Sequence, residues 1–183
     1  MKELTEQYQQ HFSDLIHELW KDEKWDEIIT ILNKEIIKYP KEYWLYTTLS
    51  EVYFIIKKYE ESYYFAEKAM QIQPKDMLVV YNYGHALSKI GKHKEAIVEW
   101  DKILNKNIED IAYGKYGEGL RWAKSMINDA RFEKASSLIS LGKKSESISL
   151  IREHLAHRQR GLPSYFTKNQ VLRTLSNVGN VSD

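Results

Sequence analysis

The chain has 183 residues, near the length of one typical domain, which predicts one domain over residues 1–183. Its 43% hydrophobic and 13% aromatic content excludes a disordered chain. Its 27 basic and 26 acidic residues nearly balance, which is not the composition of a typical nucleic-acid binder. The lack of cysteine excludes disulfide scaffolds and thiolate sites, and with no run of about 18 apolar residues we expect a cytoplasmic protein without a membrane span.

A spacing of about 34 residues recurs in the N-terminal part of the chain. It separates Pro40 from Pro74, and four further columns of residues follow the same step: Leu15, Leu49 and Tyr83; Leu19, Tyr53 and Leu87; Trp25, Tyr59 and His93; Ile29, Tyr63 and Ile97. Several columns in one register indicate a duplicated segment. The sequence therefore predicts three units, at about residues 9–42, 43–76 and 77–110.

Each unit has the pattern of two helices joined by a polar turn. In the third unit Val80, Gly84 and Leu87 fall on one face of a first helix, and Ala96 and Trp100 fall on one face of a second. Because neither helix alone can bury enough apolar surface, we expect the two faces to pack together.

These residues resemble the tetratricopeptide repeat family, whose units carry small residues where two helices meet and a proline near the end. The third unit supplies Gly84 and Ala96, and the second supplies Ala69 and Pro74. The resemblance implies an all-α, right-handed solenoid of stacked helix-turn-helix units. Because small residues at the helix contact leave no room for a larger one, we expect Gly84→Leu to cost about 1–3 kcal/mol of stability.

The register breaks after residue 110. Residues 111–127 hold three of the eight glycines of the chain, which predicts an inserted turn that opens a helix near Glu118. A degenerate fourth unit follows at about residues 128–161, with Gly142 at the turn between its helices. Residues 162–183 hold a loop and a short amphipathic run, which predicts a helix that caps the end of the solenoid.

The resemblance also implies where a partner binds. In this family the ligand contacts come from one stripe of the first helix of each unit, on the concave side of the solenoid. Read onto this sequence, the stripe gives the expected partner-binding residues Trp44, Thr48, Glu51, Phe54, Leu78, Tyr81, Asn82, His85 and Lys89. Partly exposed aromatic side chains beside polar groups are typical of binding hot spots. The alternative is that the insert or the tail folds over this face.

The expected function follows from this stripe. We expect a scaffold or adaptor that binds a partner protein or peptide, with roles as a chaperone or as a toxin-immunity-type inhibitor left open. The sequence has no nucleophile, metal or dinucleotide motif, so we expect no enzyme activity and no cofactor. His154 and His157 can share a helix face but lack the further ligands that zinc requires, so we expect no metal site.

Two further features of the C-terminal half bear on partners. Glu118, Arg121 and Trp122 have the spacing of one helix face and form an expected secondary contact site. Residues 111–183 hold 12 basic and 6 acidic residues, whereas residues 1–110 hold 15 and 20. Unless the charges are merely solvated, this asymmetry indicates an acidic partner for the C-terminal half or head-to-tail self-association. A homodimer formed through the partner-binding stripe is also left open. The alternative is an RNA bound through the basic residues Arg152, Arg158 and Arg160.

Overall fold

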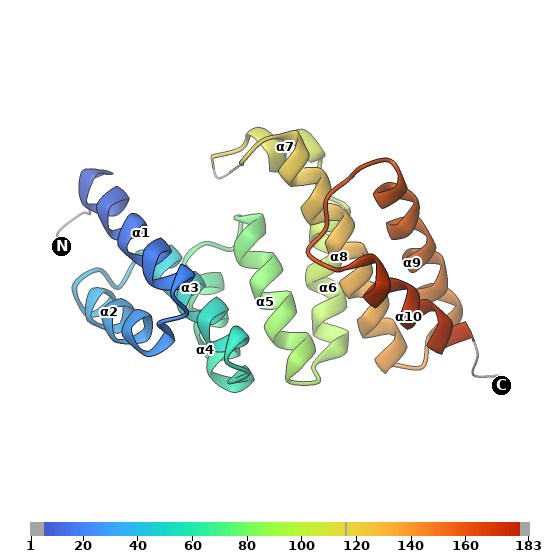
Figure 1. Cartoon of the computed structure of the whole chain (residues 1–183), viewed down its shortest axis with the longest axis horizontal. Coiled ribbons are helices and arrows are strands. Elements are labelled where there is room, and N and C mark those ends of the chain that lie inside the picture. Colours follow the sequence, from blue (N-terminus) through green and yellow to red (C-terminus); the bar gives the residue numbers. More distant parts are fainter. Residues whose placement is uncertain (1–5, 116, 180–183) are drawn as a thin grey trace. The chain divides into compact units, whose positions relative to one another are not determined.

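The computed structural model describes residues 6–115 and 117–179. Within these ranges the chain forms ten helices and no strand, which confirms the predicted all-α class. The contacts within the chain divide it into two compact units, Met1–Lys75 and Asp76–Asp183. Figure 1 shows the helices of both units. None of the helices in the described ranges combines the length and the apolar character that a membrane crossing requires.

The first unit consists of four helices, α1 (Glu6–Lys21), α2 (Trp25–Lys38), α3 (Tyr43–Ile55) and α4 (Tyr59–Ile72), and each packs against the next. Its core lies between α1, α2 and α3 and is made of eight buried side chains: Phe12, Ile16, Leu19, Ile28, Leu32, Leu45, Leu49 and Val52. Where α3 and α4 approach each other, the buried hydroxyl of Ser50 donates a hydrogen bond to the carbonyl oxygen of Ser62 over 2.9 Å. Two small residues thus occupy the contact between these helices.

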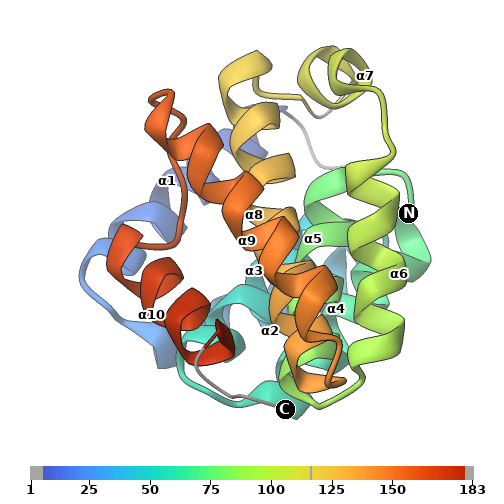
Figure 2. The same ribbon diagram turned by 90° about the vertical axis from the view of Figure 1, so that its right-hand side faces the viewer.

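The second unit begins with α5 (Met77–Lys89) and α6 (His93–Leu104), followed by the short helix α7 (Ile108–Tyr113). The long helix α8 (Leu120–Ser140), α9 (Lys144–Gln159) and α10 (Lys168–Gly179) complete it. Helix α8 packs on α6 as well as on α9, so the order of packing runs α5, α6, α8, α9 and α10, and α7 packs against α8 (Figure 2). Because α8 and α9 are antiparallel neighbours, the start of α8 lies beside the end of α9.

The repeat spacing is visible in the backbone of the turns. The turns that follow α1, α3 and α5 each contain one residue with positive φ, namely Glu23 (55°), Lys57 (63°) and Gly91 (80°), and each of these positions lies one repeat after the last. In each turn the next residue donates its N–H back into the helix, as Lys58 does to the carbonyl of Tyr53 over 2.9 Å. This is the hydrogen-bond pattern of a Schellman helix end, which a left-handed residue makes accessible. The repeated turns and the consecutive packing are consistent with a helical repeat.

The fourth helix pair shares the same turn. Gly142, between α8 and α9, has a φ of 76°, and Lys143 donates its N–H to the carbonyl of Leu138 over 2.9 Å. The helix expected to open near Glu118 is α8, which begins at Leu120 and continues past residue 128, the expected start of the fourth unit. The short helix α7 at residues 108–113 was not expected.

The expected cap is a helix, α10, that packs on α9. It buries Val171 and Val178 at one face, and Leu175 packs beside Phe132 and Ile151. Residues 180–183 of the expected cap lie outside the described residues, as do residues 1–5 and Tyr116 of the expected domain. The handedness of the solenoid and the stacking of all four units stay predictions.

Candidate functional site

The expected partner-binding residues on α3 remain partly exposed. Trp44, Thr48, Glu51 and Phe54 are half-buried, whereas Leu45, Leu49 and Val52 on the same helix are buried in the core of the first unit. The ring of Trp44 meets that of Phe12 on α1, with centroids 5.6 Å apart, and the ring of Phe54 meets that of Tyr59 at 5.8 Å. Thr48 donates its hydroxyl to the carbonyl of Trp44 in the preceding turn. The α3 stripe therefore offers two aromatic edges and two polar side chains to a ligand.

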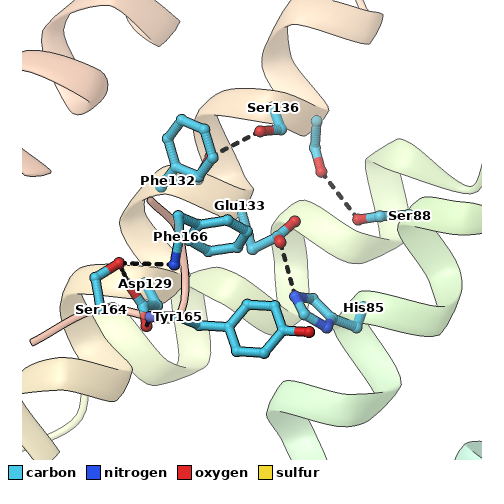
Figure 3. Close-up of polar contacts among 10 residues, drawn as sticks. His85, Ser88, Asp129, Phe132, Glu133, Ser136, Ser164, Tyr165 and Phe166 are labelled. Atoms are coloured by element: carbon cyan, nitrogen blue, oxygen red, sulfur yellow. Dashed lines mark hydrogen bonds and ion pairs between the residues drawn. The ribbon is translucent and has the colours of Figure 1, made fainter. Parts of the chain in front are cut away.

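The expected residues on α5 differ from those on α3, because two of them hold helices of the second unit together. The ring of Tyr81 lies 5.3 Å from that of Trp100 on α6, and the ring of His85 lies 5.6 Å from it. His85 Nε2 lies 2.7 Å from Oε1 of Glu133 on α8, and the two side chains are only 13% and 14% exposed (Figure 3). Of the remaining three, Leu78 and Asn82 are half-buried and Lys89 is exposed. A ligand could reach Tyr81 and His85 only at their edges.

The electrostatics of this pair agree with a structural role. Burial raises the pKa of the Glu133 carboxyl, but the charge of His85 and its hydrogen bond outweigh burial, so the pKa is lowered overall. Burial, with the Glu133 charge nearby, raises the pKa of Tyr81 well above its usual range. The Tyr81 hydroxyl therefore stays protonated at neutral pH.

The loop between α9 and α10 is tied to α8 at Asp129, one turn before Glu133. Asp129 is buried and accepts hydrogen bonds from the hydroxyl of Ser164 at 2.5 Å and from the backbone N–H of Tyr165 at 2.9 Å (Figure 3). The guanidinium of Arg158 donates to the carbonyl of Phe166, and the Phe166 ring packs on that of Phe132 with centroids 4.7 Å apart. Within the second unit, the tail thus covers part of the α8 face that carries Glu133. The alternative drawn from the sequence placed the insert or the tail over the stripe of expected partner-binding residues, and it stays a prediction.

A cavity of about 740 Å³ opens where the start of α8 meets α7, the end of α9 and this loop. Its lining combines basic and apolar side chains and contains no acidic residue: Ile108, Leu120, Arg121, Lys124, Ile127, Asn128, Arg131, His157, Arg160, Gly161, Leu162 and Pro163. The volume lies within the range of ligand pockets. Basic groups reach it from two helices, with Arg121, Lys124 and Arg131 on one stripe of α8.

Arg131 is the most enclosed of these basic groups, with a side chain that is 14% exposed. Its Nε lies 3.1 Å from Oε1 of Glu153 on α9, and its Nη1 donates to the amide oxygen of Asn128 over 3.0 Å. Asn128 is fixed in turn by α9, because it donates to the carbonyl of His154 and accepts at its own carbonyl from the ring of His154. These contacts hold the Arg131 guanidinium at one orientation in the cavity wall.

Three of the other basic groups of the cavity lack such partners, whereas His157 lies 3.9 Å from Glu153. Arg121, Lys124 and Arg160 are exposed, and none of them forms an ion pair with any side chain in residues 6–115 or 117–179. Three positive charges that lack a counter-ion within the described chain face a space lined also by Leu120, Ile127 and Leu162. The arrangement can hold a ligand that carries several negative charges and some apolar surface.

The expected secondary contact site is placed only in part. Arg121 lines the cavity, but Glu118 lies before the first residue of α8, so Glu118, Arg121 and Trp122 do not share a helix face. The error arose because Gly119 has a φ of 93° and starts the helix two residues later than the sequence indicated. Trp122 is half-buried and does not line the cavity.

The three arginines expected for RNA binding differ in their surroundings. Arg158 holds the loop, Arg160 lines the cavity, and Arg152 is exposed on α9 away from the cavity lining. Sequence reasoning missed Lys124. Its spacing of three residues from Arg121 was the available signal, since it places both side chains near one face of a helix.

Among the described residues no three histidine, aspartate or glutamate side chains converge as ligands for a metal ion. A search of the chain against protein-family models finds no match.

Proposed function

We propose that this chain is a binding protein built of tetratricopeptide-like helix pairs, which recognises a protein or peptide partner and catalyses no reaction. The observation that carries the proposal is the α3 stripe, where Trp44 and Phe54 keep partly exposed rings beside Thr48 and Glu51 while the opposite face of the helix is buried. Aromatic side chains left at the surface beside polar groups form the anchors of protein interfaces. Cytoplasmic location and an adaptor, chaperone or toxin-immunity role belong to the same proposal.

The test must avoid residues whose replacement would damage the core. Trp44 packs on Phe12, and Tyr81 packs on Trp100, so alanine at either position would weaken folding as well as binding. Thr48→Lys is a better probe, because it adds a long charged side chain on the stripe and removes only a hydrogen bond within the helix.

Thr30→Lys on α2 is a matched control. Thr30 donates its hydroxyl to the carbonyl of Asp26 over 2.8 Å, just as Thr48 donates to Trp44 over 2.9 Å, and Thr30 is exposed. We expect affinity capture from native cytosol to recover a partner with the wild type and with Thr30→Lys, and to lose it with Thr48→Lys. A partner recovered equally by all three proteins would contradict the proposed site.

A homodimer is the alternative partner within this proposal, and sedimentation of the isolated protein over a range of concentrations detects it. Nucleic acid is the weaker alternative, since the guanidinium of Arg158, one of the three arginines on which it depends, already donates to the carbonyl of Phe166. Binding of RNA would be revealed by a steep loss of affinity with salt.

A further inference from the structure

We propose that the cavity between the start of α8, α7 and the end of α9 binds an extended acidic segment of a protein partner, with carboxylates on the basic groups and apolar side chains between them. The proposal rests on the proposed function in one respect, that the ligand is a protein. It concerns a separate surface, which lies wholly within the second unit.

The spacing of the basic groups favours an extended chain over a single small anion. Arg121 and Arg131 are ten residues apart on α8, which corresponds to about 15 Å along a helix that rises 1.5 Å per residue. One phosphate or carboxylate is far too small to meet both ends of this row. An extended peptide advances about 3.3 Å per residue, so a segment of roughly five residues spans the same length.

The groups between the two ends also suit a peptide. Along α8 the lining residues after Leu120 are Arg121, Lys124, Ile127, Asn128 and Arg131, so that the apolar side chain of Ile127 lies between Lys124 and Arg131. Leu162 and Pro163 of the loop add apolar surface on the other side. A segment that alternates acidic and apolar residues would match both features.

The same lining argues against nucleic acid as the occupant. Proteins that bind single-stranded nucleic acid stack its bases on aromatic rings, in addition to contacting the phosphates. The cavity lining contains no Phe, Tyr or Trp, and the ring of Trp122 is not part of it. An RNA would find positive charge here but none of the large aromatic rings of Phe, Tyr or Trp on which to stack its bases.

Geometry and charge further define which residues recognise the segment. Arg121, Lys124 and Arg160 have no ion-pair partner in the described chain and can each receive a carboxylate. Arg131 is already held by Glu153 and Asn128, and Glu153 also lies 3.9 Å from His157 Nε2. We therefore assign the main charge recognition to Arg121, Lys124 and Arg160. Arg131 marks the far end of the row on α8, where its Nη2 takes part in neither of the contacts with Glu153 and Asn128.

The direct test is fluorescence anisotropy with a labelled peptide of five residues, Glu-Leu-Glu-Leu-Glu, and the full chain. The peptide with glutamine in place of glutamate is the neutral control for the ligand. Arg121→Gln combined with Lys124→Gln removes two exposed charges from the cavity. Arg152→Gln combined with Arg173→Gln removes two exposed charges from elsewhere in the second unit, and so controls for net charge.

We expect the acidic peptide to bind and the glutamine peptide not to bind. The cavity double variant should weaken binding about tenfold, and the control double variant should change it less than about twofold. Far-UV circular dichroism should show equal helix content in all three proteins, because none of the four side chains has an ion-pair partner in the described chain.

Three outcomes would overturn the proposal. The first is no binding of the peptide by the wild type, and the second is equal weakening by both double variants. The third is competition in which inorganic pyrophosphate or a labelled oligouridylate binds the cavity more tightly than the peptide, which would assign it to a small oxyanion or to RNA. None of these results affects partner capture through Thr48, so failure here is distinguishable from failure of the proposed function.

Discussion

Replacing Gly84 by alanine tests how closely α5 and α6 pack in the second unit. A Cβ atom at Gly84 would lie 2.8 Å from Cη2 of Trp100, 2.9 Å from Cζ2 and 3.0 Å from Cζ3. These separations are shorter than the roughly 3.5–4.0 Å at which two carbon atoms attract each other. The Trp100 ring is fully buried, so it cannot move into solvent to make room.

Two effects of opposite sign decide the size of the change. In a helix interior, alanine is more favourable than glycine by about 1 kcal/mol, because glycine has more backbone freedom to lose. Overpacking a buried contact costs about 1–3 kcal/mol. We expect overpacking to win for Gly84→Ala, with a net loss of about 1 kcal/mol. Gly84→Leu adds three more carbon atoms and should reach or exceed the upper end of the range expected from the sequence.

A double-mutant cycle with Trp100→Phe separates the two effects. Phenylalanine has a smaller ring and withdraws the atoms that meet the Cβ, so Gly84→Ala should stabilise the Trp100→Phe protein while it destabilises the wild type. The expected coupling is about 1–2 kcal/mol. Urea unfolding followed by circular dichroism gives the four free energies, and unchanged m values confirm that they are comparable. The same effect of alanine in both backgrounds would refute the close contact.

Three further predictions concern the turns, the buried histidine and the loop. Lys57→Gly should stabilise the protein by about 0.5–1 kcal/mol, and Gly91→Ala should destabilise it by about 1 kcal/mol, because both positions have positive φ. Shifts of equal sign in the midpoint of urea unfolding would contradict this. Burial lowers the pKa of His154 from its usual 6.5, so the free energy of unfolding should fall as the pH decreases below about 6.5. His154→Asn should cost about 2–4 kcal/mol of stability at pH 7. The stability of this variant should not show the fall between pH 7 and pH 5. Burial raises the pKa of Asp129, so Asp129 itself adds stability on acidification and cannot produce the same loss. Asp129→Ala should speed hydrogen exchange of the Tyr165 amide about tenfold, and an unchanged exchange rate would show that the carboxylate does not hold the loop.

The helix pairs were predictable because their signals are local. The apolar stripe, the turn and the small residue at the helix contact all lie within a single repeat, so the periodicity of the sequence carries them. The rule that glycine marks the turns fails at residues 57–58, because Lys57 adopts the left-handed conformation that Gly91 adopts one repeat later. Position in the repeat, more than residue type, determines that backbone geometry.

The site was less predictable because its contacts join distant segments. His85 and Glu133 are 48 residues apart, and Asp129 and Tyr165 are 36 apart, so no spacing in the sequence relates them. His85 therefore looked like a side chain free to meet a ligand, whereas it pairs with α8. The cavity was missed for the same reason, since its wall needs α8, α9 and the loop at once.

The length of the irregular stretch before α8 has a consequence for the cavity. The turn at Gly142 lies one and a half repeats after that at Gly91, and the extra half repeat has the length of positions 111–127. In a variant that lacks those positions, all the turns would be spaced by whole repeats of 34 residues, and the rest of α8 could still pack on α6. Such a chain would lose Arg121 and Lys124 and keep Arg131, His157 and Arg160, so one stretch of the chain carries two of the three exposed charges that are proposed to bind the acidic segment.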